Sequence, residues 1–522
     1  MLRTFSIQTL GCRVNQYESD QLATLLRARG LEEVESGGDL RIVNTCSVTV
    51  QAASKSRQTV RRAIKLPVLS QAHGSSVGLP SAKTLVVGCW ATSNPDEASK
   101  LPGVDAVLGH HDDVAQQLDR LLALWKNSAP FEGSDQFKNV HTGNRPPAES
   151  LGDEGSIISS IQAGTPRPPL APNSRPQLGQ TVKKKVREFA GGTRSLPLLH
   201  DRQSSHQRAF LKVQDGCDAH CTYCIIPQLR PVPWSKPIDE TVEEARRLVD
   251  AGHRELVLTG IFLGAYGQPT ALRRRQVIGT AKPLAELVTA LCTEVPDLRR
   301  LRFSSLEPGD LTNELIDVLR SHKQVVPHFH LPLQSGSDAI LHGMNRQYTR
   351  DDFLRMIDRV HRAFDRPAIT TDMIVGFPGE TDDEFAHTLD IVERVRFIHI
   401  HAFSFSPRPG TAAARWSSDF VHGPVVNRRI EMLNERAKVH SFEFRKQFLR
   451  ERAQVLVERN PTAGQRPASP ENTDYHHGRS ERYFDVCFTA NKTATGDLVS
   501  LVIDRISPSE TWGKIDADSP SS

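Results

Sequence analysis

Three apolar segments near the amino end of the chain share one pattern of hydrophobic and polar positions. Each is a short apolar run that leads into a cysteine: FSIQTL before Gly11-Cys12, LRIVNT before Cys46, and TLVVG before Cys89. Helical patterns lie between them, at 18–29 and 52–65. Alternating strands and helices predict a parallel sheet, and the carboxyl ends of its strands line one crevice. We therefore expect a parallel α/β domain over 1–125 in which the three cysteines converge.

Two stretches lack this periodicity. Residues 67–83 are rich in Pro, Gly and Ser, which predicts a surface insertion in the first domain. Residues 126–206 combine scattered Pro, Gly, Ser and basic residues with few apolar runs. That composition predicts a long disordered linker.

A second alternation of strands and helices begins after the linker. Six apolar segments are expected to be strands: AFLKVQ, ELVLTG, LRFSSL, HFHLPL, AITTDMIVG and HIHAFSFS. Amphipathic helical patterns lie between them, at 242–251, 284–293, 350–364 and 382–395. Six such units predict a partial parallel (β/α) barrel over 207–427, with its chemistry at the carboxyl ends of the strands.

The rest of the chain divides into a helix and a small β unit. Residues 428–449 predict a basic helical connector. Residues 450–516 contain AQVLVE, YFDVCFT, DLVSLVIDRI and WGKI, with turn residues between them. These short strands predict a small β-barrel, so the fold class is α/β with a terminal all-β unit.

Composition narrows the class of protein only slightly. The chain of 522 residues can bury several cores, and its net charge of +4 is compatible with an anionic partner without indicating one. No apolar run is long enough to span a bilayer, and MLRTFSIQTLGC lacks the features of a secretion signal. We therefore expect a cytoplasmic protein with no membrane partner and with reduced cysteines. Cys292 and Cys487 lie within an apolar helix and a strand, where core packing is expected.

The sharpest chemical pattern is Cys217-Asp-Ala-His-Cys221-Thr-Tyr-Cys224, directly after the first barrel strand. Three thiolates in one short loop can bind three corners of a cubane iron–sulfur cluster, and the missing fourth leaves one iron open to another ligand. A zinc site is the main chemical alternative, with His220 as its fourth ligand.

The segments around these cysteines resemble a known family. C-x3-C-x2-C followed by IIP on the first strand of a six-unit barrel resembles the radical S-adenosylmethionine (AdoMet) superfamily. TLGCRVNQYESD, IVNTCSVT and VVGCWA resemble the N-terminal domain of its methylthiotransferases, and HLPLQSGSDAILHGMNRQYT, DMIVGFPGET and FSFSPRPGTAAA resemble their barrel. The terminal β unit resembles their TRAM RNA-binding domain. TLGCRVNQYES and NTCSVTVQAASKSRQ most resemble the branch that acts on N6-threonylcarbamoyladenosine in tRNA.

The resemblance implies a reaction and its cofactors. It implies an auxiliary 4Fe–4S cluster on Cys12, Cys46 and Cys89, and a second 4Fe–4S cluster with AdoMet on Cys217, Cys221 and Cys224. The implied reaction adds a methylthio group at carbon 2 of the modified adenosine next to the anticodon. That C–H bond is not acidic, so radical abstraction suits it better than acid–base catalysis. The implied partners are tRNA, an electron donor and a sulfur source.

Individual residues are expected to make further contacts. Candidates for binding AdoMet follow the barrel strands: Thr259, Gly260, Glu307, Gly376 and Phe377. Candidates for binding RNA lie in basic runs: Lys55, Arg57, Arg428 and Arg429. The structural alternatives are loop glycines, a capping carboxylate and solvated helix faces. His328, His330, Gln334 and Ser335 are expected to pack or to position substrate. Residues 228–235 (QLRPVPWS) depart from the family's glycine-containing basic phrase, and Phe262 stands where a polar residue is common.

Other functions stay open from the sequence. One is methylthiolation of isopentenyladenosine in tRNA or of a ribosomal-protein aspartate. Another is a non-catalytic iron–sulfur module that binds RNA or passes electrons. An electron carrier needs no open iron, so two groups of three cysteines favour an enzyme.

Overall fold

The computed structural model describes residues 2–67, 82–127, 196–200, 207–272, 282–459, 475–490 and 493–516. Most of the insertion expected at 67–83 and most of the linker expected at 126–206 lie outside these residues. The short segment 196–200 is described and packed, because Leu199 is buried and its backbone N–H donates to Glu244 (2.8 Å). The expectation of disorder is therefore wrong for this segment.

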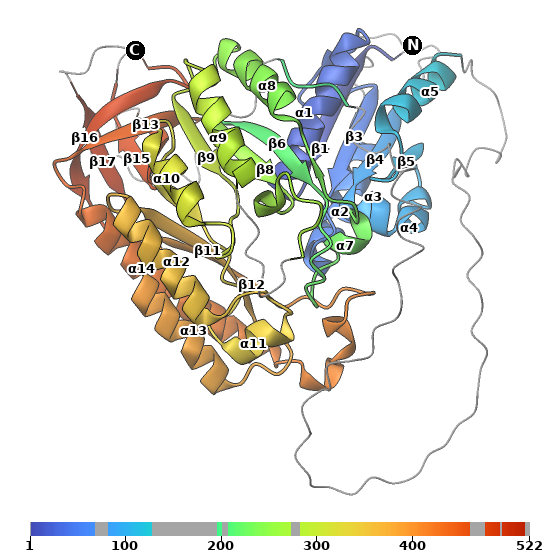
Figure 1. Ribbon diagram of the computed structural model, residues 1–522. Coiled ribbons are helices and arrows are strands. Elements are labelled where there is room, and N and C mark those ends of the chain that lie inside the picture. Colours follow the sequence, from blue (N-terminus) through green and yellow to red (C-terminus); the bar gives the residue numbers. More distant parts are fainter. Residues whose placement is uncertain are drawn as a thin grey trace, which may run out of the picture.

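The first domain is a parallel sheet with the strand order β2-β1-β3-β4-β5 (Figure 1). Its strands are β1 (Thr4–Thr9), β2 (Glu32–Glu33), β3 (Leu40–Thr45), β4 (Lys83–Gly88) and β5 (Ala106–Leu108). Its helices are α1 (Arg13–Ala28), α2 (Val50–Lys65), α3 (Cys89–Ser93), α4 (Pro95–Ser99) and α5 (Val114–Asn127). Separate apolar clusters cover the two faces, which explains why β3 is buried at every position. The predicted α/β domain is confirmed.

Helix α1 carries an acidic side chain on its buried face. Burial raises the pKa of Asp20 from 3.8 to about 7, and Gln16 is its hydrogen-bond partner (3.5 Å). The folded protein thus holds a proton that the unfolded chain releases above pH 3.8, so Asp20 costs stability as the pH rises from 3.8 through 7.

We expect Asp20→Asn to stabilise the protein at pH 8 and to change little at pH 4, because an amide carries no ionisation cost. The gain at pH 8 should be roughly 1–3 kcal/mol in the free energy of unfolding. Thermal melts at both pH values measure it. The exposed Asp317→Asn serves as the control, and an equal shift at both pH values would contradict the assignment.

The second domain is a partial barrel of six parallel strands. They are β6 (Ala209–Asp215), β8 (Glu255–Gly260), β9 (Arg300–Phe303), β10 (His328–His330), β11 (Ala368–Val375) and β12 (His399–Ser404). A short strand, β7 (Trp234–Ser235), pairs antiparallel with β6. The strands form two sheets, and isolated parallel bridges such as Ser305 to His330 connect β9 with β10. The predicted barrel is confirmed.

Helices cover the outside of this barrel (Figure 1). They are α8 (Ile238–Asp250), α9 (Lys282–Glu294), α10 (Asn313–Ser321), α11 (Asp338–Gly343), α12 (Arg350–Ala363) and α13 (Asp382–Val395). Helix α12 begins with a capping box between Thr349 and Asp352, the pattern that stops an amphipathic helix from fraying at its start. One apolar cluster unites these helices with the strands.

The chain ends in helix α14 (Gly423–Lys446) and a closed five-stranded barrel. Its strands are β13 (Arg452–Glu458), β14 (His476–Ser480), β15 (Asp485–Phe488), β16 (Leu498–Ile506) and β17 (Thr511–Ile515), in the order β13-β14-β15-β17-β16. The turn between β14 and β15 reaches the larger barrel, where Tyr483 stacks on His328 (4.2 Å between ring centroids). The predicted β-barrel is confirmed, and His328 has a packing role. Among the described residues, no helix combines the length and the hydropathy needed to cross a bilayer.

Candidate cluster sites

The first three cysteines stand at the carboxyl ends of adjacent strands. Cys12 follows β1 and precedes α1, Cys46 follows β3 directly, and Cys89 follows β4 directly and begins α3. Strands β1, β3 and β4 are neighbours in the sheet. The topology therefore brings the three thiols to one edge of the domain, as the sequence predicts.

Asn15 connects this trio and is a site residue that the sequence did not reveal. Its side chain is fully buried and donates to the carbonyls of Leu10 and Thr45, at 2.9 Å each. The Cys12 and Cys89 thiols point to its Oδ1 atom, at 4.0 and 3.9 Å. One amide thus holds two strand ends and faces two thiols. The available signal was an asparagine on the buried face of α1.

Glycines precede two of the three cysteines because the backbone turns sharply there. Gly11 has φ +101°, and a Cβ on it would lie 3.0 Å from the Cys46 sulfur. Gly88 has φ +91°, and a Cβ on it would lie 2.3 Å from the side chain of Asn44. These positions therefore accept only glycine without rearrangement of the trio.

The second trio occupies the loop after β6. The backbone N–H of Cys217 donates to Arg230 (2.9 Å), and that of Cys224 donates to Cys221 (3.0 Å). The Cys221 sulfur accepts a hydrogen bond from Arg346 (3.2 Å). Phe262 belongs to the apolar cluster that packs against Cys217 and Cys221. Its apolar side chain, a departure from the family pattern, thus shields the loop from water.

The zinc alternative finds no support in this loop. His220 has φ +46°, and its side chain is exposed. Within the described part of the chain, no three His, Cys, Asp or Glu side chains are gathered so as to hold one metal ion. A cubane makes a different demand, because each thiolate binds a different iron.

Burial affects the acidity of the thiols in both trios. It raises the pKa of Cys46 and Cys89, and it raises the pKa of Cys217 and Cys224 to about 12. Free thiols in these positions are protonated at neutral pH. Binding of iron as thiolate therefore has to release protons, as is usual for metal sites built from cysteine.

Both trios approach the short helix α7 (Ile226–Leu229). Cys89, of the first trio, forms a buried cluster with Ile225 and Leu229. Ile225 follows Cys224 directly in the chain. The two candidate cluster sites are therefore neighbours across the boundary between the first domain and the barrel (Figure 1).

A buried ionic network joins the same two domains. Arg230 donates to Glu18 of α1 (2.7 and 2.8 Å) and to Asp215 at the end of β6 (2.8 and 2.9 Å). Lys212 donates to the same two carboxylates, at 2.8 and 2.7 Å. The segment 228–235, which departs from the family phrase, thus supplies the arginine that fastens α1 to the barrel.

The residues expected to bind AdoMet divide into two groups. Thr259, at the end of β8, is buried, and its hydroxyl has no hydrogen-bond partner among the described residues. Gly260 follows it and packs against Gln214. Glu307 forms an ion pair with Arg346, which also contacts Cys221. Glu307 thus lies beside the second trio, and Thr259 and Gly260 end the strand that pairs with β6.

Gly376 and Phe377 have evident structural roles. Gly376 has φ +74°, and a Cβ on it would lie 2.4 Å from Val426 of α14, so its small size lets that helix approach. Phe377 is buried against Phe405 and Trp416, in an apolar cluster that also contacts Tyr223 of the cysteine loop. Phe377 thus packs beside the cysteine loop, whereas Gly376 serves the packing of α14.

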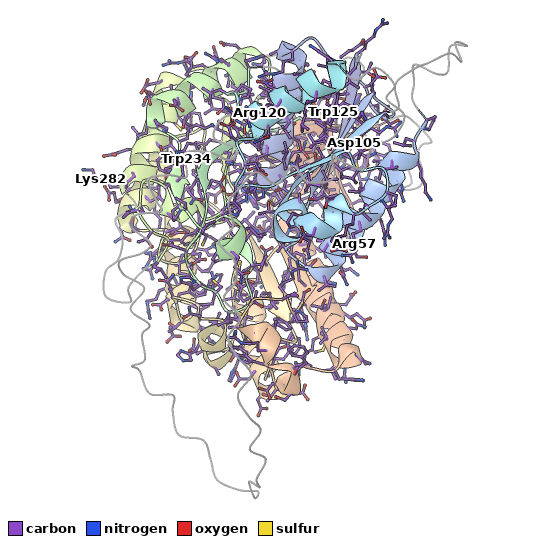
Figure 2. All side chains as sticks on the ribbon, turned by 90° about the vertical axis from the view of Figure 1, so that its right-hand side faces the viewer. Arg57, Asp105, Arg120, Trp125, Trp234 and Lys282 are labelled. Atoms are coloured by element: carbon purple, nitrogen blue, oxygen red, sulfur yellow. The ribbon has the colours of Figure 1, made fainter. Side chains whose placement is uncertain are left out.

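The residues expected to bind RNA differ in exposure. Lys55 and Arg428 are exposed, and Arg57 is half-buried beside Glu97 (3.4 Å). Figure 2 shows Arg57 at the lower rim of the first domain, on the side toward the later part of the barrel. Arg429 is buried and forms ion pairs with Glu380 and Asp382 of the segment around the start of α13. That arginine fixes α14 in place, so the expectation of an RNA contact is wrong for it.

The charged residues of α2 are all basic. They are Lys55, Arg57, Arg61, Arg62 and Lys65. By contrast, α14 interleaves its arginines and lysines with glutamates. The two remaining cysteines, Cys292 and Cys487, are buried in apolar clusters, as predicted.

Comparisons with known proteins agree with this architecture. The Radical SAM superfamily model matches residues 211–392, and a family described as Uncharacterized protein family UPF0004 matches residues 4–109. A solved structure of the radical AdoMet methyltransferase TsrM from Kitasatospora setae has a TM-score of 0.50 at 15% identity, covering 79% of this chain and 74% of that chain. That likeness concerns the fold alone. The fold and the cysteine loop define a radical AdoMet enzyme.

Sequence relatives narrow the class further. Threonylcarbamoyladenosine tRNA methylthiotransferase MtaB of Bacillus subtilis is 31% identical, over 96% of this chain and 94% of its own length. The enzyme of the same name from Thermotoga maritima is 34% identical, over 88% and 87%. The tRNA-2-methylthio-N(6)-dimethylallyladenosine synthase of Maricaulis maris is 32% identical, over 87% and 86%. The chain belongs to the radical AdoMet methylthiotransferase family.

The family's cofactors are AdoMet and two 4Fe–4S clusters, and the donors present fit them. Each trio offers three soft thiolate ligands, which suits an iron–sulfur cubane with one iron left for another ligand. The unpartnered hydroxyls of Thr259 and Ser304, both buried at the ends of neighbouring barrel strands, suit a polar cofactor beside the second trio.

Proposed function

We propose that this chain converts N6-threonylcarbamoyladenosine next to the anticodon of tRNA to its 2-methylthio derivative, in the cytoplasm. One observation supports the proposal: two groups of three cysteines approach the same short helix α7, and each lacks a fourth thiolate. The names of the Bacillus subtilis and Thermotoga maritima relatives support the substrate. The Maricaulis maris relative has similar identity and another named substrate, so the choice of branch rests on the motifs around Cys12 and Cys46.

In this proposal the six cysteines have fixed tasks. Ligands of the auxiliary cluster are Cys12, Cys46 and Cys89, and ligands of the cluster that binds AdoMet are Cys217, Cys221 and Cys224. When bound, the second cluster and AdoMet supply the radical chemistry that can remove hydrogen from carbon 2 of the adenine. An electron donor and a sulfur source complete the reaction.

The chain's own residues orient the reactants and exclude water. Phe262 and its apolar neighbours cover the cysteine loop. Arg346 holds both Glu307 and the Cys221 sulfur, and the buried hydroxyl of Thr259 is left without a partner among the described residues. We propose that Thr259, Gly260 and Glu307 contact AdoMet, and that exposed basic side chains of α2 and α14 contact the tRNA backbone. Lysine and arginine bind phosphates without sequence preference.

Analysis of tRNA nucleosides by mass spectrometry tests the function. Cells that lack the gene should lose 2-methylthio-N6-threonylcarbamoyladenosine and accumulate its precursor, and the gene supplied in trans should restore the product. A selective loss of the methylthio derivative of isopentenyladenosine would move the enzyme to the other tRNA branch. Unchanged tRNA with loss of a methylthioaspartate in a ribosomal protein would contradict the proposal, as would a reconstituted protein that never cleaves AdoMet.

A further inference from the structure

Strand β12 carries a row of ring side chains on one face. His399, His401 and Phe403 alternate along the strand, so all three project from the same side of the sheet. The ring of His401 stacks on that of Phe403, with 6.4 Å between the centroids and 16° between the planes. The same ring meets His399 edge to face, at 4.2 Å. We call these three residues the β12 ladder.

The ladder stands on the inner face of the barrel, and solvent reaches it. On the opposite face of β12, Ile400 is buried in the apolar cluster that also contains Leu433 of α14. On the ladder side, His401 meets the ring of His330 from β10, at 5.9 Å. Phe403 is 48% exposed, although it belongs to a strand of the barrel. Core packing therefore explains one face of β12 and leaves the ladder without a task.

The first two rings of the ladder line a cavity. Its volume is about 780 Å³, and it lies between β12, α14 and the closed five-stranded barrel, with His399 and His401 in its wall. Its charged lining residues are Lys438, Arg445, Arg479, Asp485 and Glu510. Cations thus outnumber carboxylates beside the rings. Unpaired RNA has the matching chemistry, because it offers flat bases to rings and phosphates to cations.

The other end of the ladder adjoins the first trio. Three residues after Phe403, the hydroxyl of Ser406 accepts a hydrogen bond from the backbone of Val50 (2.9 Å), just beyond Cys46. Val48 and Val50 are themselves 44% and 46% exposed. Exposed apolar side chains therefore come from two segments that meet at this point. Such a gathering is typical of a binding surface.

The middle ring of the ladder is uncharged at neutral pH, although a cation lies near it. Burial, and then the neighbouring His399, lower the pKa of His401 to about 4. The charge of Arg13, which follows Cys12 directly, also reaches His401. A flat uncharged ring beside a cation suits a nucleobase and the phosphate attached to it.

We propose that Phe403 and His401 stack on an unpaired base of the anticodon loop, directly next to the adenosine that reacts. Proteins commonly hold single-stranded loops of RNA by stacking their bases on aromatic side chains. A base held in this way no longer stacks on its neighbour, which leaves the target adenine accessible. The inference rests on the proposed function and adds to it the surface that holds the loop open.

Titration with anticodon stem-loop hairpins tests the ladder without depending on turnover. Three hairpins share one sequence: one is intact, and the others have an abasic site directly before or directly after the target adenosine. With reconstituted enzyme, Phe403→Ala should weaken binding of the intact hairpin by roughly 5- to 100-fold. One of the abasic hairpins should bind the wild type about as weakly, and Phe403→Ala should weaken that hairpin no further.

Three further variants separate stacking from apolar contact. Phe403→Trp should keep the affinity for the intact hairpin, because the larger ring still stacks. Phe403→Leu keeps apolar bulk without a flat face, so it should lose nearly as much as Phe403→Ala. Leu124→Ala removes an apolar side chain that is 53% exposed on α5 of the first domain. This matched control should bind all three hairpins as the wild type does.

The remaining outcomes each decide the matter. Equal weakening of all three hairpins by Phe403→Ala would show that no neighbouring base stacks there and would overturn the proposal. Unchanged binding, or full affinity in Phe403→Leu, would overturn it as well. Product analysis separates the two levels, because a wild-type enzyme that binds the hairpins yet never methylthiolates the adenosine contradicts the proposed function. Methylthiolation by the wild type, with binding that Phe403→Ala leaves intact, contradicts only the ladder.

Discussion

Replacement of Cys221 by alanine is expected to leave anaerobically reconstituted protein with roughly four irons per chain, against roughly eight in the wild type, because two thiols no longer hold a cubane. Production of 5′-deoxyadenosine from AdoMet should fall below detection. The sulfur of Cys221 lies in the middle of the loop and is the one that Arg346 contacts, so its loss also frees that guanidinium. Iron assay and chromatography of the reductive reaction measure both effects.

Two further variants make this result specific. Cys89→Ala removes a ligand from the other trio, so it should also lose about half of the iron, yet it should still cleave AdoMet. Cys292→Ala changes a thiol on the buried face of α9, in the apolar core of the barrel. Both iron content and AdoMet cleavage should persist in this variant. Cys221→Ala protein that keeps its full iron and its AdoMet cleavage would refute the assignment of the second trio.

Local patterns in the sequence were sufficient to predict the strands and helices and to place the first three cysteines at strand ends. Apolar runs that end at Cys12, Cys46 and Cys89 predict strands, and a parallel sheet places the ends of its strands at one edge. The order of the parallel strands by itself accounts for how these cysteines come to the same edge. Element boundaries were less accurate, since α14 begins at Gly423, before the connector expected at 428–449. A Pro next to that start is a signal for the first helical turn.

Contacts between distant segments could not be read from such patterns. Glu18 and Arg230 are 212 positions apart, and only the packing of α1 on the barrel brings them together. For the same reason, Arg429 reads as one member of a basic run, although its partners Glu380 and Asp382 lie on another part of the barrel. Asn15 is a similar case, because a buried asparagine is informative only once the strand ends around it are known.

Arg230→Met is expected to destabilise the folded protein by about 3–5 kcal/mol at pH 7, because it removes one partner from a buried ionic network. Burial alone would raise the pKa of Glu18, but the charges of Arg230 and Lys212 lower it from 4.5 to about 2. In the variant, Lys212 still contacts Glu18 and Asp215, but the charge of Arg230 is gone. Chemical denaturation at pH 7 measures the loss. The exposed Arg246→Met, whose partner is Glu294, should change stability by less than about 1 kcal/mol.

The pH dependence of this effect distinguishes a charge network from simple packing. In the wild type the folded pKa of Glu18 lies below the unfolded value, so its stabilising contribution is complete above pH 4.5 and is lost as the pH falls toward 2. Without Arg230 that pKa rises, and protonation of Glu18 relieves the uncompensated charge. The gap between variant and wild type should therefore narrow as the pH falls from 7 toward 4. A gap that stays constant would indicate lost packing alone. Because the network fastens α1 to β6, Arg230→Met should also reduce formation of methylthiolated product more than AdoMet cleavage.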